Sequence, residues 1–436
     1  MNINRNITLW PKRPQYTDIK LNTGEACFKY MRYTGKRMRK VLVLRGAPGA
    51  GKTTWIKDKK LVPYTLSFDN IRMLYQSPIQ TIYGRESTGQ KANAQAYDTL
   101  FSILEERMKN GEFTVIDCVN SKKSQIQKYQ ELALKYRYEL YVVDFTTVPI
   151  GVAKSRNIHR SARKRVPDSV VENAYNEFKE EALSDKIKVI KPDELNTIYE
   201  KPVDLSGYRK IHHIGDIHGC DEVLKRALND NGNLREDEFY IFLGDYTDKG
   251  PRSDRILEFL LSIRNKPNVI LCEGNHEHWI WNWSNGIEDY SEDFMTNTFP
   301  QLNGINKKDI RKLYRQLKEC FIYTYKGKNV LNTHGGLATI PEHIDYISGH
   351  QMIHGVGLHI DLPCISKTFA DSMPPNWYEV FGHRNPGGLT MNSGNRVYFL
   401  ENGIDVGGTL RWLTLDGGGF HEKEYDNVSL IKKETA

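Results

Sequence analysis

Residues 40–53, Lys40-Val-Leu-Val-Leu-Arg-Gly-Ala-Pro-Gly-Ala-Gly-Lys-Thr53, decide the fold of the first half of the chain. An apolar run bounded by charge is typical of a buried parallel strand, and here it leads into the pattern Gly-x4-Gly-Lys-Thr. The glycines let backbone N–H groups converge on phosphate oxygens, and the N-terminus of the next helix adds positive potential. We therefore predict a phosphate-binding loop (P-loop) between a strand and a helix that begins at Lys52.

We predict nucleotide contacts for six residues of this loop. Lys52 can reach the β and γ phosphates of ATP, and the Thr53 hydroxyl can join the coordination shell of Mg²⁺. ATP and Mg²⁺ are therefore the cofactors that we expect in the first half of the chain. The predicted nucleotide-binding residues of the loop are Gly46, Gly49, Gly51, Lys52, Thr53 and Thr54.

Short apolar runs and helical patterns alternate after this loop. Apolar runs at 113–117 and 140–145 are separated by helical patterns at 92–109 and 123–135. This alternation is typical of an α/β fold with a parallel sheet.

A second series of apolar runs follows a looser stretch near 190–208. The runs of this series are 210–214, 238–243, 268–272, 328–332 and 378–381. The sequence thus predicts an α/β chain of two folded domains. Its predicted segments are a basic N-terminal segment at 1–39, a P-loop domain at 40–190, a linker at 191–208 and a second domain at 209–425.

Composition limits the class of protein. With 436 residues, 39% hydrophobic and 26% charged, the chain suits two or three soluble globular domains. No apolar run approaches the roughly 18 to 20 residues of a membrane span, and the start MNINRNITLW lacks the apolar core of a signal peptide. We expect a cytoplasmic protein without membrane contacts, located in the host cytoplasm if it is viral. The six cysteines contain no CxxC pair and are expected to be structural.

The net charge of +7 is concentrated at the N-terminus. Residues 1–40 hold ten Lys or Arg against two acidic residues, so the rest of the chain is close to neutral. Aromatic residues such as Trp10 and Tyr30 are interleaved with these cations, a composition that can bind a nucleic-acid backbone and stack on bases. A solvated arm or a small cap on the P-loop domain is the alternative.

Two further features in the first half favour a kinase. Asp69 follows an apolar stretch, where it can take a proton from an acceptor hydroxyl, and Arg72 can hold an acceptor phosphate on the same side of the first helical turn. An N-capping Asp with a surface Arg is the alternative. The basic stretch at 154–167 can supply cations to the transferred phosphoryl group, although a charge run is usually a solvated face.

Four motifs of the first half resemble, in order and spacing, the 5′-kinase domain of polynucleotide kinases: GAPGAGKTT (46–54), SFDNIR (67–72), VIDCVN (115–120) and RNIHR with RVP (156–167). The resemblance implies that Asp69 is the general base for a 5′-hydroxyl and that Arg72 contacts the acceptor's 3′-phosphate. Lys52 and Thr53 would bind ATP phosphates and metal.

The same resemblance assigns a lid arginine and two acceptor contacts. Arg160 best matches the catalytic lid arginine, with Arg156 and Arg163 as competitors that would bind the nucleotide. Asp117 and Asn120 fall where the family has a strand-end pair near the acceptor.

The second half carries five strand-to-loop junctions that each offer an oxygen or imidazole ligand. Such a set suits a pair of divalent ions about 3.5–4 Å apart that clamp a phosphate and activate water. Mixed imidazole, carboxylate and amide ligands favour Mn²⁺, Fe or Zn²⁺ over Ca²⁺, and we expect two Mn²⁺ ions. The junctions are Gly215-Asp-Ile-His-Gly219, Gly244-Asp-Tyr-Thr-Asp-Lys-Gly250, Gly274-Asn-His-Glu277, Thr333-His-Gly-Gly336 and Phe381-Gly-His383.

These junctions resemble the calcineurin-like metallophosphoesterase superfamily over residues 210–415, which implies a β-sandwich flanked by helices. The resemblance implies that His276 protonates the leaving oxygen and that Asp248 holds His276 in place. Asp245 would bridge the two metals. The implied metal ligands are Asp216 and His218 on the first metal, Asp245 on both, and Asn275, His334 and His383 mostly on the second.

One departure concerns the substrate phosphate. The family commonly has Asp-Arg-Gly where this chain has Asp248-Lys249-Gly250, and Lys offers a point charge instead of a bidentate grip. We expect Lys249 to contact the phosphate, with Arg252 as a substitute for the missing arginine. The remaining histidines match no motif and are expected to be structural: His212, His213, His278, His343, His350, His354, His359 and His421.

The two halves together resemble the bacterial polynucleotide kinase-phosphatases, which heal RNA ends. The resemblance implies a kinase that makes 5′-phosphates and a phosphatase that removes 3′-phosphates or opens 2′,3′-cyclic phosphates. RNA ends, and DNA ends as a further substrate, would be the partners. Because the chain has no Lys-x-Asp-Gly motif of a ligase, a separate RNA ligase is expected downstream. Self-association into a homo-oligomer is also expected from the kinase family.

Two alternatives remain open at this point. One is a small-molecule P-loop kinase fused to a protein Ser/Thr phosphatase or a dinucleoside-polyphosphate hydrolase. The other is a non-catalytic nucleic-acid-binding protein that uses ATP as a switch.

Overall fold

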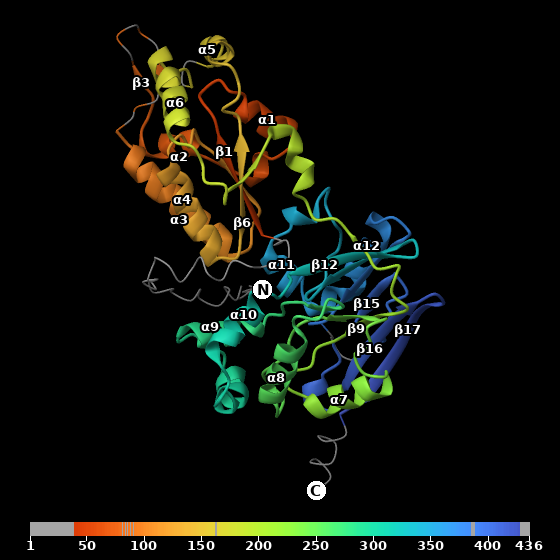
Figure 1. Cartoon of the computed structure of the whole chain (residues 1–436). Helices are drawn as coiled ribbons and strands as arrows, with labels where there is room; N and C mark the ends of the chain where they lie inside the picture. Colours follow the sequence, from red (N-terminus) through yellow and green to blue (C-terminus); the bar gives the residue numbers. More distant parts are fainter. Residues whose placement is uncertain are drawn as a thin grey trace, which may run out of the picture.

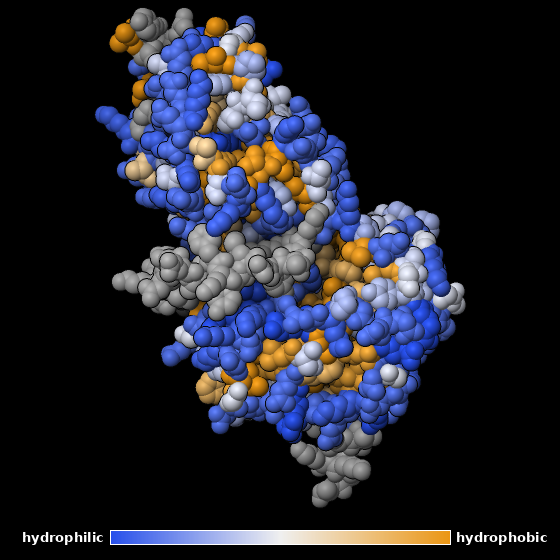
Figure 2. Space-filling model, viewed as in Figure 1, coloured by the Kyte–Doolittle hydropathy of each residue, from blue (hydrophilic) through white to orange (hydrophobic). Residues whose placement is uncertain are grey.

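The computed structural model of the chain describes residues 39–427, except 81, 83, 85, 88, 90, 162, 163 and 385–388. The predictions for residues 1–38 and for Arg163 therefore lie outside the described residues. Within the described part, no helix has the length and apolar character that crossing a membrane requires. Figure 2 shows a face that is predominantly hydrophilic over both domains.

The N-terminal domain is built on a five-stranded parallel sheet with the order β2-β5-β1-β6-β7. Its elements are β1 (Lys40–Arg45), α1 (Lys52–Asp58), η2 (Val62–Tyr64), β2 (Thr65–Ser67), α2 (Phe68–Tyr75), β3 (Ile79–Gln80), β4 (Glu86–Ser87), α3 (Asn93–Lys109), β5 (Thr114–Asp117), α4 (Lys123–Lys135), β6 (Glu139–Asp144), α5 (Ile150–Ile158), α6 (Asp168–Glu180) and β7 (Lys188–Ile190).

The central strand β1 explains why its sequence is apolar without alternation. Val41 and Val43 face a core formed with α2, α3 and α4, whereas Leu42 and Leu44 face a core formed with α1. Both faces of the strand are therefore buried, as in other parallel sheets. After β1 the chain forms β2 and β5 on one side of β1, and it then forms β6 and β7 on the other side. The strand order therefore changes direction beside β1. Ligands of open α/β sheets bind at the carboxyl ends of strands at such a switch.

The second domain packs two five-stranded mixed sheets face to face, with orders β11-β10-β9-β16-β17 and β15-β14-β13-β12-β8. Its strands are β8 (Val203–Asp204), β9 (Ile211–Ile214), β10 (Phe239–Phe242), β11 (Val269–Leu271), β12 (Cys320–Tyr325), β13 (Lys328–Thr333), β14 (Trp377–Phe381), β15 (Val397–Phe399), β16 (Thr409–Asp416) and β17 (Gly419–Asp426). Its helices are α7 (Asp221–Asp230), α8 (Ser253–Ile263), α9 (Glu277–Asn285), η4 (Phe294–Thr298), η5 (Phe299–Gln301), α10 (Lys307–Tyr314), η6 (Ile344–Tyr346), α11 (Gly349–His354), η7 (His359–Asp361), α12 (Leu362–Ser372) and η8 (Ile404–Val406).

Three apolar cores hold this domain together. One lies between the sheets and includes Ile241 and Val330. A second lies under α7, α8, α9 and α10, and a third lies under α11 and α12. The result is a helix–sheet–sheet–helix sandwich (Figure 1). The structure thus confirms the predicted α/β two-domain fold, with a parallel sheet first and a helix-flanked sandwich second.

The segment 191–208 connects the domains and is more ordered than the predicted loose linker. It forms η3 (Pro192–Thr197), and β8 within it pairs with β12 of the second domain. Leu195 packs in the core of the P-loop domain, and the Trp55 indole N–H donates to the Pro192 carbonyl oxygen at 2.8 Å. The connection is therefore packed against both domains. In Figure 1 the P-loop domain lies above the second domain, with α11 at the junction.

Candidate active sites

The P-loop has the backbone geometry that phosphate binding requires. Gly49 and Gly51 have φ angles of 85° and 98°, in the region that favours glycine. A Cβ added at Gly49 would lie 2.1 Å from the Ala153 carbonyl oxygen, so α5 packs directly on the loop. The Lys52 ammonium donates to the carbonyl oxygens of Gly46 and Ala47, at 2.6 and 3.1 Å, and thus lies across the loop.

Thr53 and Asp117 face each other at the carboxyl ends of the sheet. The Thr53 hydroxyl donates to Asp117 Oδ2 at 3.1 Å, and burial raises the pKa of Asp117. The sequence assigned Asp117 to the acceptor, but the structure places it beside the hydroxyl predicted to bind Mg²⁺. A hydroxyl and a strand-end carboxylate in contact are a suitable pair of oxygen ligands for this ion. Thr54 is exposed on α1.

Asp69 and Arg72 form one unit on the first turns of α2. The helix is capped by Ser67, so Asp69 is not its N-cap, and Arg72 is buried, so it is not a surface residue. The Arg72 guanidinium donates to Asp69 Oδ1 at 2.5 Å and to Asn93 Oδ1 at 3.1 Å. The structure thus disagrees with the alternative of an N-capping Asp and a solvated Arg.

Arg160 interacts electrostatically with the carboxylates of Asp69 and Asp117. Burial lowers the pKa of Arg160, and Asp69 and Asp117 oppose that effect. Burial likewise lowers the pKa of Lys52. The charges of Asp117 and Asp69 oppose this effect, and the charge of Arg160 adds to it. The structure therefore brings Lys52, Asp69, Asp117 and Arg160 into one cluster around the P-loop.

Two other predicted residues of this site differ in their placement. The Arg156 guanidinium reaches within 3.5 Å of a Cβ built at Gly51, so it lies against the P-loop. Asn120 is fully buried, and its amide donates to the Leu44 carbonyl oxygen at 2.8 Å. The prediction that Asn120 contacts substrate is corrected on this point, because its side chain instead fastens β1 to the loop after β5.

The candidate metal ligands of the second domain follow the carboxyl ends of parallel strands. Strands β9, β10 and β11 are parallel neighbours, and they are followed by Asp216 with His218, by Asp245 and by Asn275. Strands β13, β14 and β15 are also parallel, and they are followed by His334, His383 and Glu401. The two sheets thus deliver their ligands to one edge of the sandwich.

Asp245 lies at the centre of this cluster. Its Oδ2 lies 3.2 Å from His334 Nε2, 3.8 Å from His218 Nε2 and 3.9 Å from His276 Nε2. Asn275 Oδ1 lies 3.1 Å from His334 Nε2. A carboxylate with imidazoles on several sides is placed to bridge two ions.

The histidine rings are oriented by backbone carbonyl groups. Nδ1 of His218 lies 3.0 Å from the Thr247 carbonyl oxygen, and Nδ1 of His334 lies 2.8 Å from that of Leu243. Both contacts turn Nε2 toward Asp245, the arrangement usual for metal-ligating histidines. Burial lowers the pKa of His383 to about 2, so its imidazole is neutral, as a metal ligand must be.

Backbone strain is concentrated at this edge. Positive φ angles at non-glycine residues are uncommon and are often found at functional sites. Five site residues adopt them, with φ values between 40° and 73°: His218, Asp245, Asp248, Lys249 and His383.

The donor set fits divalent metal ions. Ligand atoms within 4.8 Å of one another form three overlapping groups: Asp245 with His334 and His383, Asp245 with His218 and His276, and Asp216 with His218 and Glu401. Asp216 Oδ1 and Glu401 Oε2 are buried and have no hydrogen-bond partner among the described residues. Burial and the nearby Glu401 and Asp245 raise the pKa of Asp216 well above its usual value. Carboxylates that face one another in this way lack a countercharge that cations would supply.

Two glutamates were missed or left without a role by sequence reasoning. Glu401 joins Asp216 and His218, and its signal was a strand-like run immediately before it, the same pattern that precedes the other ligands. Glu277 accepts hydrogen bonds from the backbone N–H groups of Asp245, Tyr246 and Gly274, at 3.0, 2.9 and 2.7 Å. Glu277 thus fixes the loop of the bridging carboxylate to the loop of Asn275.

His276 and Asp248 form the predicted pair. His276 Nδ1 lies 2.7 Å from Asp248 Oδ2, and the Thr298 hydroxyl donates to Asp248 Oδ1 at 2.7 Å. Although burial opposes it, Asp245 and Asp248 raise the pKa of His276 to about 9. These two carboxylates thus favour the protonated form of His276, which can donate a proton.

Lys249 and Arg252 occupy different positions. Lys249 Nζ lies 3.2 Å from His218 Nε2, so this ammonium lies at the cluster. The Arg252 guanidinium pairs with Asp254 at 2.9 Å and is partly exposed. Its substitution for the family's arginine stays a prediction.

Some histidines expected to be structural lie close to the cluster. The His359 and His354 rings lie 5.3 and 6.3 Å from the His383 ring. By contrast, His212 lies 3.0 Å from Glu238 and His213 lies 3.0 Å from the Tyr323 hydroxyl. The latter two are buried and structural, as predicted.

Comparison with known families agrees with this division. Residues 209–420 match the family model of the calcineurin-like phosphoesterases, and residues 41–182 match that of an AAA domain. The chain thus joins a P-loop domain of the kinase-like AAA type to a calcineurin-like metallophosphoesterase domain, which is the predicted two-domain arrangement.

Several individual proteins are similar to part of the chain. The asymmetrical bis(5′-nucleosyl)-tetraphosphatase PrpE of Halalkalibacterium halodurans is 21% identical over 218 residues, 45% of this chain and 86% of that protein. PrpE of Oceanobacillus iheyensis is 26% identical over 148 residues, 31% of this chain, which spans only 58% of that protein. A solved structure described as a putative diadenosine tetraphosphatase has a TM-score of 0.37 and 19% identity, and the match covers 51% of this chain and 96% of that one.

Proposed function

We propose that the protein heals nucleic-acid ends, with an ATP-dependent 5′-hydroxyl polynucleotide kinase and a metal-dependent 3′-phosphatase that also acts on 2′,3′-cyclic phosphates. The observation that carries the proposal is the cluster of Lys52, Asp69 and Arg160 at the P-loop. A carboxylate opposite the phosphate-binding cations suits transfer to a hydroxyl acceptor, because the acceptor proton needs a base.

In the kinase reaction, Asp69 would accept the proton of the 5′-hydroxyl as its oxygen bonds to the γ-phosphorus of ATP and the bond to ADP breaks. Lys52 and Arg160 would stabilise the charge on the transferred phosphoryl group. Thr53 and Asp117 would hold Mg²⁺. Arg72, which already orients Asp69, would bind the neighbouring phosphate of the acceptor.

In the phosphatase reaction, two divalent ions would polarise the phosphate and activate water, and Mn²⁺ is the ion that we expect. Asp216, His218, Asp245, Asn275, His334 and His383 would hold these ions, and Glu401 would assist them. His276 would donate a proton to the leaving oxygen, and Asp248 would keep its Nε2 directed toward the cluster. Lys249 would contact the substrate phosphate.

The test is a panel of RNA and DNA oligonucleotides with 5′-hydroxyl, 3′-phosphate or 2′,3′-cyclic phosphate ends. We expect transfer of the γ-phosphate of ATP to a 5′-hydroxyl end, and loss of this transfer in Lys52→Ala. We also expect Mn²⁺-dependent clearance of the 3′ ends, after which a separate ligase would seal the products. Absence of transfer to every RNA and DNA end would refute the proposal.

A second candidate is a small-molecule kinase joined to a dinucleoside-polyphosphate hydrolase, favoured by the similarity to two PrpE proteins. Comparing Mn²⁺-dependent hydrolysis of diadenosine tetraphosphate, a phosphopeptide and a 3′-phosphorylated RNA separates the candidates. Preference for the RNA end supports end healing. Preference for the dinucleotide, without action on RNA, supports the second candidate.

A further inference from the structure

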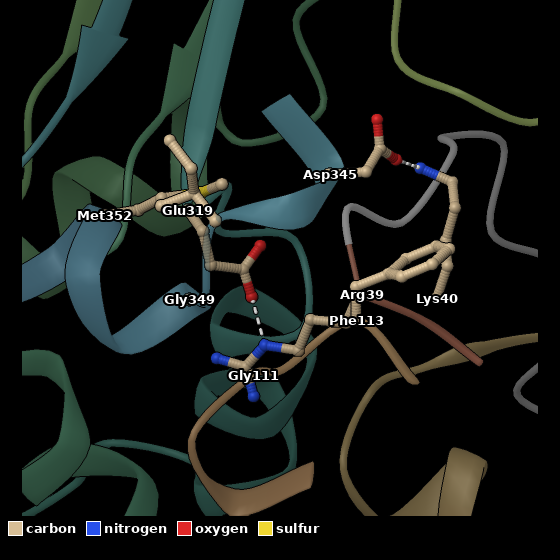
Figure 3. Close-up of a pocket in the computed structure, with 9 residues that line it drawn as sticks. Arg39, Lys40, Gly111, Phe113, Glu319, Asp345, Gly349 and Met352 are labelled. Carbon is tan, nitrogen blue, oxygen red and sulfur yellow. Dashed lines mark hydrogen bonds and ion pairs between the residues drawn. The ribbon is translucent and has the colours of Figure 1, made fainter. Parts of the chain in front are cut away.

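A buried ionic cluster crosses the boundary between the two domains. The P-loop domain contributes Arg137, from the loop between α4 and β6, and Arg39 joins it from the residue directly before β1. The second domain contributes Glu273 and Glu319. Arg137 Nη2 lies 2.5 Å from both Glu273 Oε2 and Glu319 Oε1, and Arg39 Nε lies 2.6 Å from Glu319 Oε1. Figure 3 shows Arg39 directed at Glu319 across the junction.

Arg137 is more firmly held than a surface ion pair would be. Its Nη1 donates to the Tyr314 carbonyl oxygen at 2.9 Å, and its guanidinium lies over the Tyr314 ring at 4.7 Å. The Tyr314 hydroxyl donates in turn to Glu273 Oε1 at 2.5 Å. Glu273 and Glu319 are 3% and 4% exposed. Two buried carboxylates are thus balanced by two guanidinium groups, which removes the penalty of burying unpaired charge.

The position of Glu273 gives this cluster its importance. Glu273 lies two residues before Asn275 and three before His276, in the loop that follows β11. Its side chain is held by Arg137, while its backbone N–H donates to the Lys318 carbonyl oxygen at 2.8 Å. The loop that carries a metal ligand and the proton donor therefore begins at a residue anchored by the other domain.

A second contact between the domains leads through α11 to the residue that follows His334. The carbonyl oxygens of Gly111 and Asn110 accept from the backbone N–H groups of Gly349 and His350, at 3.1 and 3.0 Å, at the start of α11. The carbonyl oxygen of Met352 in this helix accepts from Gly335, the residue after His334, at 2.9 Å.

We propose that Arg137 of the P-loop domain is a positioning residue of the phosphoesterase centre, which holds the Asn275–His276 loop in place through Glu273. The P-loop domain is then a structural part of the phosphatase. This proposal rests on the phosphoesterase chemistry of the second domain and not on the identity of the substrate.

The removal of Arg137 would leave two buried carboxylates opposite Arg39 alone. The loop would relax toward water, and its metal ligand and proton donor would lose their positions. Outer-shell partners of metal sites typically contribute about 10-fold to 100-fold in metal affinity or activity. We expect a loss of this size in kcat for Arg137→Ala, with a smaller change in KM.

The experiment compares full-length wild type with Arg137→Ala, Arg137→Lys and the control Lys135→Ala. Lys135 pairs with Glu105 on the surface of the same domain, two residues from Arg137. The readouts are Mn²⁺-dependent hydrolysis of p-nitrophenyl phosphate, Mn²⁺ affinity by calorimetry, and hydrogen exchange of residues 272–279 in metal-free protein. Nucleotide binding at the P-loop reports whether each variant is folded.

For Arg137→Ala we expect lower kcat, weaker Mn²⁺ binding and faster exchange at 272–279, with nucleotide affinity within about twofold of wild type. Arg137→Lys keeps the charge without the planar fork and should recover part of the loss. Lys135→Ala should behave as wild type. If Arg137→Ala does not fold, the same comparison uses Arg137→Lys, whose deficit should be confined to the phosphoesterase readouts.

A folded Arg137→Ala with wild-type kcat, Mn²⁺ affinity and exchange at 272–279 would overturn the proposal. A lower melting temperature without these changes would also overturn it, because the role would then be structural only. The affinity and exchange readouts need no substrate. They therefore test the positioning role even if the RNA-end assays fail.

Discussion

Asp69→Asn is the substitution that most sharply tests the kinase site. Asparagine keeps an oxygen for the Arg72 guanidinium, which lies 2.5 Å from Asp69 Oδ1, so the local structure and the acceptor-binding arginine should stay in place. The substitution removes only the ability to accept a proton. General-base catalysis contributes roughly 10²-fold to 10⁴-fold. At about 1.4 kcal/mol per tenfold, the activation free energy should rise by about 2.8 to 5.6 kcal/mol.

The assay is steady-state transfer of the γ-phosphate of ATP to a 5′-hydroxyl oligonucleotide. We expect kcat to fall by two to four orders of magnitude, while the KM for ATP and phosphatase activity stay close to wild type. Asp98→Asn, at an exposed acid on α3, is the matched control and should leave kcat unchanged. An Asp69→Asn enzyme with kcat within threefold of wild type would refute the role of Asp69 as base.

Three further outcomes follow from the structure. Asp216→Ala should abolish phosphatase turnover and spare ATP-dependent transfer, since the two sites share no residue; loss of both activities in a folded protein would contradict this separation. Burial raises the pKa of Glu379 to about 8 from an ordinary value of 4.5, so the folded state keeps a proton that the unfolded state releases. Relative to Glu379→Gln, the free energy of unfolding of wild type should fall by about 1.4 kcal/mol per pH unit between these two pKa values. Urea unfolding at pH 5 and pH 8 measures this fall. Equal pH slopes for wild type and Glu379→Gln would exclude the raised pKa. Chelation should lower the melting temperature of wild type but not of Asp245→Ala, because ions that bind only the folded state stabilise it by about 2.7 kcal/mol at 100 times their dissociation constant; an unchanged wild-type melting curve would speak against the metal site.

The sequence was sufficient for those parts of the sites that are encoded locally. A strand followed by a glycine-rich turn has few alternatives, which is why the P-loop and the start of α1 at Lys52 could be predicted. The candidate metal ligands could be predicted because each follows an apolar strand, and parallel strands bring their carboxyl ends to one edge.

Interactions between distant segments were beyond such reasoning. Asn120 is a polar residue at a strand end, like the candidate site residues, yet its amide donates to the Leu44 carbonyl oxygen on the neighbouring strand. The contact of Arg137 with Glu273 joins residues 136 positions apart and leaves no local pattern. The 191–208 segment looked loose because its apolar residues pack on other parts of the chain, as Leu195 does, and not on one another.

The most direct test of the central claim is the number of Mn²⁺ ions bound per chain without nucleotide, measured by calorimetry and electron paramagnetic resonance. We predict two ions with the spin coupling of a bridged pair. Both should be lost or severely weakened in Asp245→Ala, the shared ligand, and retained in Lys52→Ala at the separate P-loop. A single uncoupled ion, or two ions that persist in Asp245→Ala, would contradict the bridged centre.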